Sequence, residues 1–477
     1  MPGMPSEKDY LRVIAHGLPD MPGKRKRVAI VGAGMAGLTA ASALLRAGHD
    51  PIVLEAKQRV GGRVCTLREP FTHGLYAEVG AMRIPRSHKL TLAYVDKFGL
   101  ATHDFTMDNP EGWCHLFGRK HRFREIEAKP HLVGAHLPEK ERGATCTAMW
   151  QRALRPFVDR LAAVGDDAWP EIVGKYDSYS TREFLEEIGW SEAAIELFGL
   201  LMNQESLMST SFLELLREEV GHFYTDMVRI DGGMDHLPQG FLPQLQSRIR
   251  FGARMVALDQ SDHDVCIHYQ TAAGRARLHA DHAIIAVPFP VLRHVEMLKP
   301  LSQNKRRAIR QLHYDASAKI LFQCRRRFWE EDEGIFGGGS VTDLAVRNIF
   351  YPEAGRETGR GVLLASYTWS EDAQRWGSLS PEERIVQAIE NVAVIHPQIK
   401  EEFEVGASKM WHDDPFAGGA FALFEPSQQS LLYSHIIAPE GRIHFAGEHA
   451  SLHHAWIQGA IESGLRAAGE INALGDG

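Results

Sequence analysis

Three glycines near the N-terminus have the spacing that binds the pyrophosphate of a dinucleotide. Gly32, Gly34 and Gly37 form a G-x-G-x-x-G pattern. The apolar residues 28–31 before them predict a buried strand, and the Ala/Leu-rich residues 38–47 after them predict a helix. Gly32 permits a tight turn, Gly34 lets the backbone approach the phosphates, and Gly37 lets the helix pack on the strand. Unpaired N–H groups at the start of this helix would face the phosphates.

A carboxylate follows at the position expected for binding the ribose of such a dinucleotide. The second predicted strand, residues 51–55, ends in Glu55, about twenty residues beyond the glycines. Its carboxylate can accept from both ribose hydroxyls and would repel a 2′-phosphate, which favours FAD or NAD over NADP. Gly61, Gly62 and Arg63 add backbone N–H groups and a guanidinium near the pyrophosphate. A turn without a ligand is disfavoured because strand, helix and acid occur together.

Arg83 is the next residue whose type suggests a bound anion. It lies in an otherwise largely apolar, glycine-containing stretch, residues 78–85, where burying a guanidinium without an anion is costly. Its planar fork of N–H donors matches the geometry of a carboxylate. From the residues alone, a structural salt bridge, for example with Glu78, is favoured over a bound substrate.

The motifs and their order resemble the FAD-binding flavin amine oxidase superfamily and, within it, the L-amino acid oxidases. Matching stretches extend along nearly the whole chain and include residues 9–11, 232–238, 328–335, 337–344, 445–448, 455–457 and 463–468. The resemblance implies FAD as the cofactor. It also reverses the interpretation of Arg83, which would bind the substrate α-carboxylate together with the phenol of Tyr367.

The resemblance assigns further residues to the substrate side of the flavin. Ala455 and Trp456 would lie beside the flavin and the substrate amine, and Ala455 replaces a glycine common in the animal enzymes. Lys319 would hold a water at flavin N5; its place in an apolar strand supports this role, with a solvent-facing lysine as the alternative. Ala420, in place of a β-branched residue, would enlarge the side-chain pocket. His222 aligns only roughly with a substrate-side histidine, and a surface position is at least equally favoured.

The expected site therefore combines the glycine motif with the positions that the resemblance supplies. The expected catalytic residues are Lys319, Arg83, Tyr367 and Trp456, and Trp369 and Phe421 are expected near the pocket. The residues expected to contact FAD are Gly32, Gly34, Met35, Ala36, Gly37, Glu55, Ala56, Gly62, Arg63, Gly80, Ala81, Met82, Arg83, Met255, Glu448, Ala455, Trp456, Ile457 and Ala460.

The implied reaction is the oxidative deamination of L-amino acids, with hydride passing from Cα to flavin N5. Oxygen would reoxidise the flavin to give hydrogen peroxide, and the imino acid would hydrolyse to a 2-oxo acid and ammonia. Three alternatives stay open. An amino acid 2-monooxygenase would release an amide from the same scaffold. A polyamine or monoamine oxidase is disfavoured by Arg83 and Tyr367, and a flavin-bearing binding protein without turnover is disfavoured by the intact catalytic set.

The composition is that of an ordinary globular protein. The chain has 477 residues, 44% hydrophobic and 24% charged, and its net charge of −8 argues against a nucleic-acid partner. No apolar run reaches the roughly 18 residues of a membrane span, and residues 1–20 lack the apolar core of a signal peptide. Five scattered cysteines without zinc-ligand spacing predict free thiols in a reducing compartment and no metal site. We therefore expect a cytoplasmic protein without a membrane partner and, because the family is commonly dimeric, a homodimer.

The elements that must position these residues divide the chain into three predicted domains of an α/β protein. A discontinuous Rossmann-type FAD-binding domain comprises residues 24–70, 238–315 and 430–475. A mixed-sheet substrate-binding domain comprises residues 1–23, 71–124, 226–237 and 316–429, and a helical domain comprises residues 125–225. In the helical domain, apolar periodicity predicts helices at residues 151–163, 181–188, 193–202 and 212–220.

The C-terminal segment is expected to complete the flavin site. Residues 443–446 predict a strand that ends at Glu448, on the edge where doubly wound sheets bind ligands. The next helix contains the small residues Gly459, Ala460 and Gly464, which allow the close approach of a bulky group. Taken alone, ordinary helix packing explains these residues equally well, but the FAD motif at the other end of the chain favours the flavin.

Overall fold

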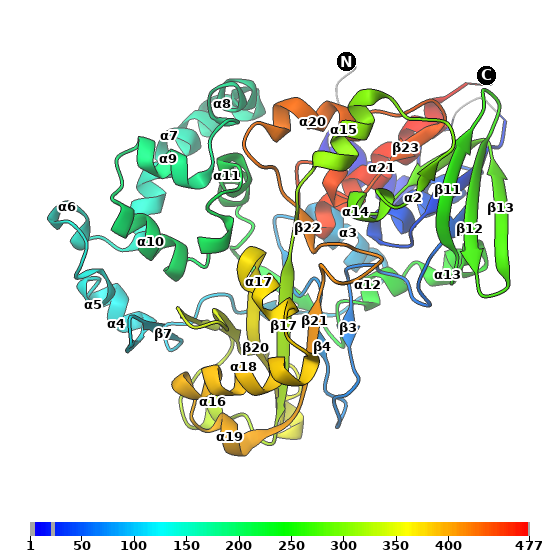
Figure 1. The fold of residues 1–477 in the computed structure, drawn as a ribbon. Helices are drawn as coiled ribbons and strands as arrows, with labels where there is room; N and C mark the ends of the chain where they lie inside the picture. The colour runs from blue at the N-terminus through cyan, green and yellow to red at the C-terminus, as the bar shows by residue number, and fades with distance from the viewer. Residues whose placement is uncertain (1–4, 21–23, 476–477) are drawn as a thin grey trace.

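The computed structural model describes residues 5–20 and 24–475 and has the expected mixed α/β fold (Figure 1). Its strands form several sheets, and the longer helices of residues 146–220 form a group at one side of the molecule. Residues 1–4 and 21–23, which belong to the predicted substrate-binding domain, lie outside the described residues. None of the described helices combines the length and the apolar character that crossing a membrane requires.

A five-stranded parallel sheet has the Rossmann-type arrangement and takes its strands from three separate stretches of the chain. In spatial order the strands are β10 (Ile249–Arg250), β2 (Asp50–Leu54), β1 (Arg27–Val31), β14 (His282–Ile285) and β23 (Ile443–Phe445). In β1 and β14 buried residues follow one another almost without interruption, as expected for a parallel sheet covered on both faces. Because the strands are parallel, the segments that follow them meet at one edge.

Helix α2 (Met35–Arg46) follows β1 directly and begins three residues before the predicted start at residue 38. Gly34 is its N-cap, so that the last glycine of the motif, Gly37, lies within its first turn. A Cβ atom on Gly37 would lie 1.9 Å from the carbonyl oxygen of Gly32. Only glycine fits between this helix and the turn, which explains why the pattern ends with a third glycine.

Helix α21 (Ile457–Ala473) packs on α2, where Gly464 allows the close contact, and Gly459 faces Ser451 and His453 in the segment before the helix. A Cβ atom on Gly464 would lie 2.4 Å from the carbonyl oxygen of Ala36, and one on Gly459 would meet protein atoms at 2.2 Å. The expectation that these two glycines admit the cofactor is therefore wrong. Of the three small residues, only Ala460 borders the cavity described below.

A seven-stranded mixed sheet carries two of the residues expected on the substrate side, Lys319 and Tyr367. In spatial order its strands are β21 (Phe403–Met410), β17 (Ser317–Cys324), β20 (Gly361–Trp369), β19 (Asn348–Phe350), β18 (Gly339–Thr342), β7 (Trp113–Leu116) and β8 (Arg119–Arg122). The neighbours β17 and β20 are antiparallel, and their register places Lys319 directly opposite Tyr367. Directly opposed residues project from the same face of a sheet. Two residues almost fifty positions apart in the chain thus become neighbours.

Smaller sheets complete the strand inventory. One contains β11 (Arg254–Gln260), β12 (Val265–Thr271), β13 (Gly274–Ala280) and β15 (Glu296–Met297), and another contains β5 (Ile84–Pro85), β9 (Met227–Ile230) and β6 (Thr102–Phe105). The two-stranded pairs are β3 (Thr66–Leu67) with β4 (Ala77–Glu78) and β16 (Tyr314–Asp315) with β22 (Phe421–Ala422).

The helical group contains all four helices predicted from apolar periodicity. They are α7 (Cys146–Val164), α9 (Thr181–Glu187), α10 (Glu192–Leu201) and α11 (Phe212–Val220), with α8 (Trp169–Tyr176) between the first two. Helix α7 begins five residues before its predicted start, and a Ser180–Glu183 capping box begins α9 as its sequence indicates. The other α-helices are α1 (Glu7–His16), α3 (Lys89–Lys97), α4 (Phe123–Ala128), α5 (His131–Gly134), α6 (Glu139–Arg142), α12 (His236–Gln239), α13 (Leu242–Leu245), α14 (Phe289–Leu292), α15 (Gln303–Gln311), α16 (Phe328–Glu331), α17 (Ser370–Gly377), α18 (Pro381–Ile395), α19 (Ile399–Glu402) and α20 (Gln428–Ile437).

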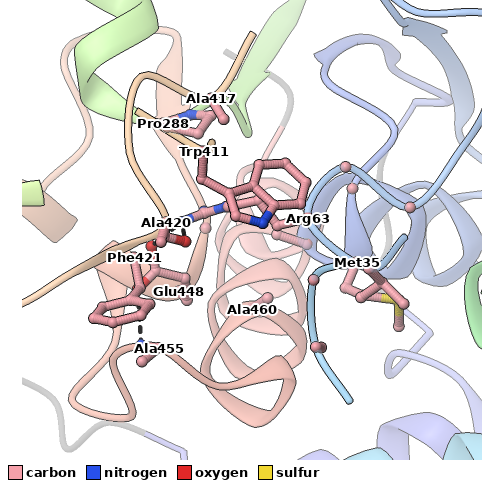
Figure 2. A pocket seen from close by; sticks show the side chains of 18 of the residues that line it. Met35, Arg63, Pro288, Trp411, Ala417, Ala420, Phe421, Glu448, Ala455 and Ala460 are labelled. Atoms are coloured by element: carbon pink, nitrogen blue, oxygen red, sulfur yellow. Dashed lines mark hydrogen bonds and ion pairs between the residues drawn. The ribbon is translucent and has the colours of Figure 1, made fainter. Parts of the chain in front are cut away.

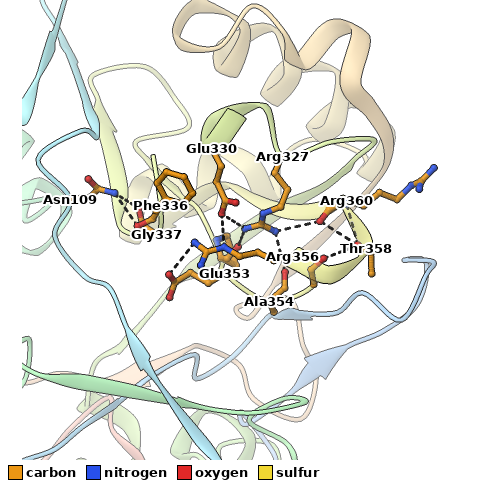
Figure 3. Close-up of polar contacts among 12 residues, drawn as sticks. Asn109, Arg327, Glu330, Phe336, Gly337, Glu353, Ala354, Arg356, Thr358 and Arg360 are labelled. Atoms are coloured by element: carbon orange, nitrogen blue, oxygen red, sulfur yellow. Dashed lines mark hydrogen bonds and ion pairs between the residues drawn. The ribbon is translucent and has the colours of Figure 1, made fainter. Parts of the chain in front are cut away.

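A buried arginine fixes the loop that leads from β19 into β20, the strand that carries Tyr367 (Figure 3). Arg327 Nη2 donates to Glu330 Oε1 at 2.7 Å and to the Pro352 carbonyl oxygen at 2.6 Å. Arg356 Nε donates to the same Glu330 oxygen at 3.0 Å. The two arginines differ in exposure, because the Arg327 side chain is 4% exposed and the Arg356 side chain is 42% exposed.

This difference predicts unequal effects of removing each arginine. Arg327→Ala removes the buried cation beside the Glu330 carboxylate and the donor to several carbonyl groups, so we expect the free energy of unfolding to fall by about 3–5 kcal/mol. Arg356→Ala removes a partly exposed partner of the same carboxylate and should cost about 1 kcal/mol or less. Urea denaturation followed by circular dichroism measures both variants, and equal losses would show that burial does not set the contribution of Arg327.

Candidate active site

One large cavity lies between the parallel sheet, the seven-stranded sheet and helix α11, and it encloses about 2020 Å³, including its solvent-open mouth. Most residues that the sequence nominates line it. They are Gly32, Gly34, Met35, Ala36, Glu55, Ala56, Gly62, Arg63, Gly80, Ala81, Met82, Arg83, Met255, Lys319, Tyr367, Ala420, Glu448, Ala455, Trp456, Ile457 and Ala460. Gly37 does not line the cavity, since it faces the turn before α2. Trp369 and Phe421 also border the cavity.

The turn between β1 and α2 has the properties of a phosphate-binding site. No side chain caps the first turn of α2, which leaves its N–H groups available to an anion. A Cβ atom on Gly34 would meet no protein atom within 4 Å, so open space lies in front of this residue. The Gly61 N–H donates to the Ala33 carbonyl oxygen at 2.8 Å and holds the second glycine loop against the turn.

Glu55 follows β2 and is anchored by the backbone. Its Oε2 accepts from the Ala33 N–H at 2.7 Å and its Oε1 from the Lys57 N–H at 2.8 Å. Burial raises the pKa of this carboxyl, and the two backbone hydrogen bonds oppose the rise. Each oxygen keeps a further lone pair for a ribose hydroxyl. The uncapped helix, the open space at Gly34 and this carboxyl fit the phosphates and ribose of FAD.

An ion pair ties the first and last parts of the cavity wall together (Figure 2). Arg63 Nη1 donates to Glu448 Oε1 and to the Ala420 carbonyl oxygen, both at 2.8 Å. The other Glu448 oxygen accepts from the Ala455 N–H at 3.1 Å. The backbone of Ala455 has φ +65°, a conformation that favours glycine. This geometry explains why glycine suits that position.

Lys319 lines the cavity and is 1% exposed, so the alternative of a solvent-facing lysine is wrong. Its Nζ donates to the carbonyl oxygens of Glu78 at 3.0 Å and Gly80 at 2.8 Å. The same nitrogen lies 4.5 Å from the centre of the Tyr367 ring. Burial lowers the pKa of Lys319 to about 7.

Arg83 is a cation without an ion-pair partner among the described residues. Its Nη1 is buried and makes no hydrogen bond. The guanidinium carbon lies 5.6–5.8 Å from the ring centres of three aromatic residues, Phe105, Tyr224 and Phe350. Such rings attract a cation weakly and leave its N–H donors unsatisfied. Burial raises the pKa of the Tyr367 phenol, and the nearby Arg83 charge opposes this rise.

The salt bridge between Arg83 and Glu78, which the residues alone favoured, is absent. Glu78 instead accepts from Thr66 Oγ1 at 3.0 Å and from the Met234 N–H at 2.8 Å. Burial raises the pKa of Glu78 to about 7. Arg83 therefore borders the cavity with a buried Nη1 that has no acceptor among the described residues, and a ligand could supply one.

Helix α11 contributes residues to the cavity that sequence reasoning missed. Glu214 and Glu218, one turn apart, line the cavity together with Tyr224. The sequence signal that could have identified these two acids is their spacing of four residues, which places both on one face of the predicted helix. His222, which was aligned with a substrate-side histidine, is exposed and does not line the cavity.

The fold and the cavity together define a protein with a Rossmann-type dinucleotide site whose cavity is also lined by residues of the second sheet. Residues 35–472 match the model of the flavin containing amine oxidoreductases. The chain belongs to this family: it is an oxidoreductase, and its cofactor is FAD.

Known relatives cover nearly the whole chain. YobN of Bacillus subtilis (strain 168), provisionally named an L-amino-acid oxidase, is 41% identical over 98% of both chains. The L-amino-acid oxidase of Siganus canaliculatus is 36% identical over 98% of this chain and 89% of its own. That of Sistrurus catenatus edwardsii is 34% identical, with 98% and 90% covered. A putrescine oxidase triple mutant has the same fold, with a TM-score of 0.75 at 22% identity over 94% of this chain and 99% of that chain.

The different surroundings of two motif glycines predict different defects. In Gly34→Ala the new methyl group meets no protein atom, so the apoprotein should keep its stability while FAD affinity falls about tenfold or more. In Gly37→Ala the methyl group clashes with the Gly32 carbonyl oxygen, so we expect the apoprotein itself to lose about 1–3 kcal/mol. FAD titration and denaturation of both apoproteins test this assignment. An unstable Gly34→Ala apoprotein that binds FAD normally would contradict it.

Proposed function

We propose that this enzyme oxidises L-amino acids to 2-oxo acids with release of ammonia and hydrogen peroxide. The observation that carries the proposal is the unpaired Arg83 guanidinium, which lines the same cavity as Lys319 and Tyr367. A carboxylate is the anion that matches the planar donor fork of arginine. The names of the relatives over nearly the full chain length agree with this substrate class.

The residues of this chain bind and orient the substrate in the proposed reaction. Arg83 and the Tyr367 phenol hold the α-carboxylate, which fixes the position of Cα and its hydrogen. Ala455 and Trp456 border the amine, and Lys319 with its apolar surroundings favours the uncharged amine and holds a water molecule. FAD, held by the residues of the glycine motif and by Glu55, would supply the two-electron oxidation chemistry when bound. The released imino acid reacts with water to give the 2-oxo acid and ammonia.

The division of labour within the chain belongs to the same proposal. The segments 24–70, 238–315 and 430–475 would bind FAD, the segments 1–23, 71–124, 226–237 and 316–429 would hold the substrate, and residues 125–225 would close the pocket. We also propose a cytoplasmic homodimer. All five cysteines are free in the structure, which agrees with a reducing compartment.

Product analysis separates the proposed oxidase from a monooxygenase on the same scaffold. Incubation with an L-amino acid in air should yield equal amounts of 2-oxo acid, ammonia and hydrogen peroxide, because the substrate carboxylate is held and not expelled. Mass spectrometry and a peroxidase-coupled assay quantify these products. An amide with one carbon fewer, in place of the 2-oxo acid, would identify an amino acid 2-monooxygenase.

Removal of the carboxylate anchor should impair the oxidation of amino acids specifically. For Arg83→Ala we expect KM to rise and kcat/KM to fall by about 10²-fold or more, because a bidentate charge-assisted contact is lost. Arg86→Ala is the matched control, since this exposed arginine pairs with Asp104 and Asp226 and does not line the cavity. Steady-state kinetics of both variants with bound FAD test the assignment, and wild-type kinetics for Arg83→Ala would refute it.

A further inference from the structure

The cavity contains a second charged group without a partner of opposite charge, the carboxyl of Glu218 on helix α11. Its Oε1 accepts from Trp456 Nε1 at 2.9 Å, and its Oε2 accepts from Tyr224 Oη at 3.0 Å. Among the described residues, no Lys, Arg or His nitrogen lies within 4.0 Å of the Glu218 carboxyl oxygens. Glu218 therefore makes no ion pair there. Both donors are neutral, and both also line the cavity.

The neighbouring acid of the same helix shows what a compensated carboxylate looks like here. Glu214 lies one turn earlier and also borders the cavity, but its Oε1 is 2.9 Å from Nδ1 of the buried His454. Burial alone would raise the pKa of Glu214, yet this ion pair lowers it. Burial raises the pKa of Glu218 to about 7, with the two neutral donors opposing the rise. Glu218 therefore has the surroundings of a carboxylate whose cationic partner would be part of a bound ligand.

The surroundings of Glu218 suit a long side chain that ends in a cation. The rings of Tyr224 and Trp456 lie 5.8 Å apart at 67° beside the carboxyl, and such ring faces attract cations. Leu207, Leu215 and other apolar residues continue the wall from the helical segment, against which methylene groups can pack. The carboxyl still has free lone pairs to accept from an ammonium or guanidinium.

The cation in question is on the substrate side chain and not on its α-amine. A hydride leaves Cα readily only when the α-amine is uncharged, and a carboxylate beside this amine would stabilise its protonated form. An anion that holds the α-ammonium would thus oppose the reaction. A cation at the far end of the side chain carries no such penalty.

We infer that Glu218 is a specificity-determining residue that selects L-amino acids with a positively charged side chain, such as arginine, lysine and ornithine. This inference rests on the proposed function, in which Arg83 and Tyr367 hold the α-carboxylate. The substrate then spans two unpaired groups of the cavity, with its carboxylate at Arg83 and its terminal cation at Glu218. A neutral side chain of equal length would leave Glu218 without a charged partner.

The test compares substrates of nearly equal shape and different charge on the FAD-loaded enzyme. L-arginine is compared with L-citrulline, and L-lysine with L-norleucine, by kcat/KM for wild type, Glu218→Gln, Glu218→Asp and Glu219→Gln. The wild-type enzyme should prefer each cationic substrate by about 10- to 100-fold, the range of one charge-assisted hydrogen bond. Glu218→Gln should abolish most of this preference, and Glu218→Asp, which keeps the charge, should retain part of it. Glu219→Gln is the matched control, because this neighbouring acid does not line the cavity.

The possible outcomes separate this inference from the function on which it rests. Similar kcat/KM values for L-arginine and L-citrulline in the wild-type enzyme would overturn the inference and leave the amino acid oxidase intact. An equal loss for both substrates in Glu218→Gln would also overturn it, since Glu218 would then only position Tyr224 and Trp456. If no L-amino acid reduced the bound FAD, the proposed function itself would fail. If Glu218→Gln does not retain FAD, the inference is tested by the ratio of kcat/KM for cationic and neutral substrates, measured in the wild-type enzyme and in Glu218→Asp.

Discussion

A partly buried guanidinium, which has a buried Nη1 and no ion-pair partner in the described part of the chain, is the feature on which the interpretation of this site depends. Removing a charge from water costs several kcal/mol unless another group compensates it. Around Arg83, aromatic rings at 5.6–5.8 Å and the charge of the Asp108 carboxyl compensate in part, but the buried Nη1 has no hydrogen-bond acceptor among the described residues. The carboxylate that completes this arrangement is the one that the proposed substrate brings. The same chemistry without such an anchor would suit a simple amine, so in the proposed function this one residue separates two substrate classes on one fold.

The cavity that Arg83 borders is assembled by contacts between distant parts of the chain. Pairing of β17 with β20 sets Lys319 against Tyr367. The ion pair between Arg63 and Glu448 joins the first cofactor-binding segment to the last. Both contacts link residues far apart in the sequence, so the site exists only after the whole chain has folded. Helix α11 then closes the cavity from a third part of the chain and brings the carboxyl of Glu218 to its wall.

Local patterns in the sequence were sufficient for the dinucleotide motif and four of the helices, and the family resemblance supplied most of the cavity lining. The glycine motif and the apolar periodicity reflect backbone geometry within a few residues, and for this reason they predicted the β1–α2 turn and the helices of residues 146–220. Pairings between distant side chains leave no such local trace. The prediction of a salt bridge between Arg83 and Glu78 was wrong, because the Glu78 carboxyl accepts hydrogen bonds from Thr66 Oγ1 and the Met234 N–H instead. Glu218 went unnoticed because the direction in which a helical acid points depends on how its helix packs. Gly459 and Gly464 were assigned to the cofactor, since small residues are equally suited to a ligand and to a neighbouring helix.

The most direct test of the role of Arg83 is the rate at which substrates reduce the bound FAD in the absence of oxygen. Stopped-flow absorbance would compare several L-amino acids, each with its D-enantiomer and with the amine formed by its decarboxylation. A carboxylate anchor predicts that the L-amino acid reduces FAD at least about 100-fold faster than the matched amine at low concentration, and that the D-enantiomer is inert. Reduction by the amine as fast as by the amino acid would show that the carboxylate is not recognised. The cavity would then belong to an amine oxidase, and Arg83 would have another role.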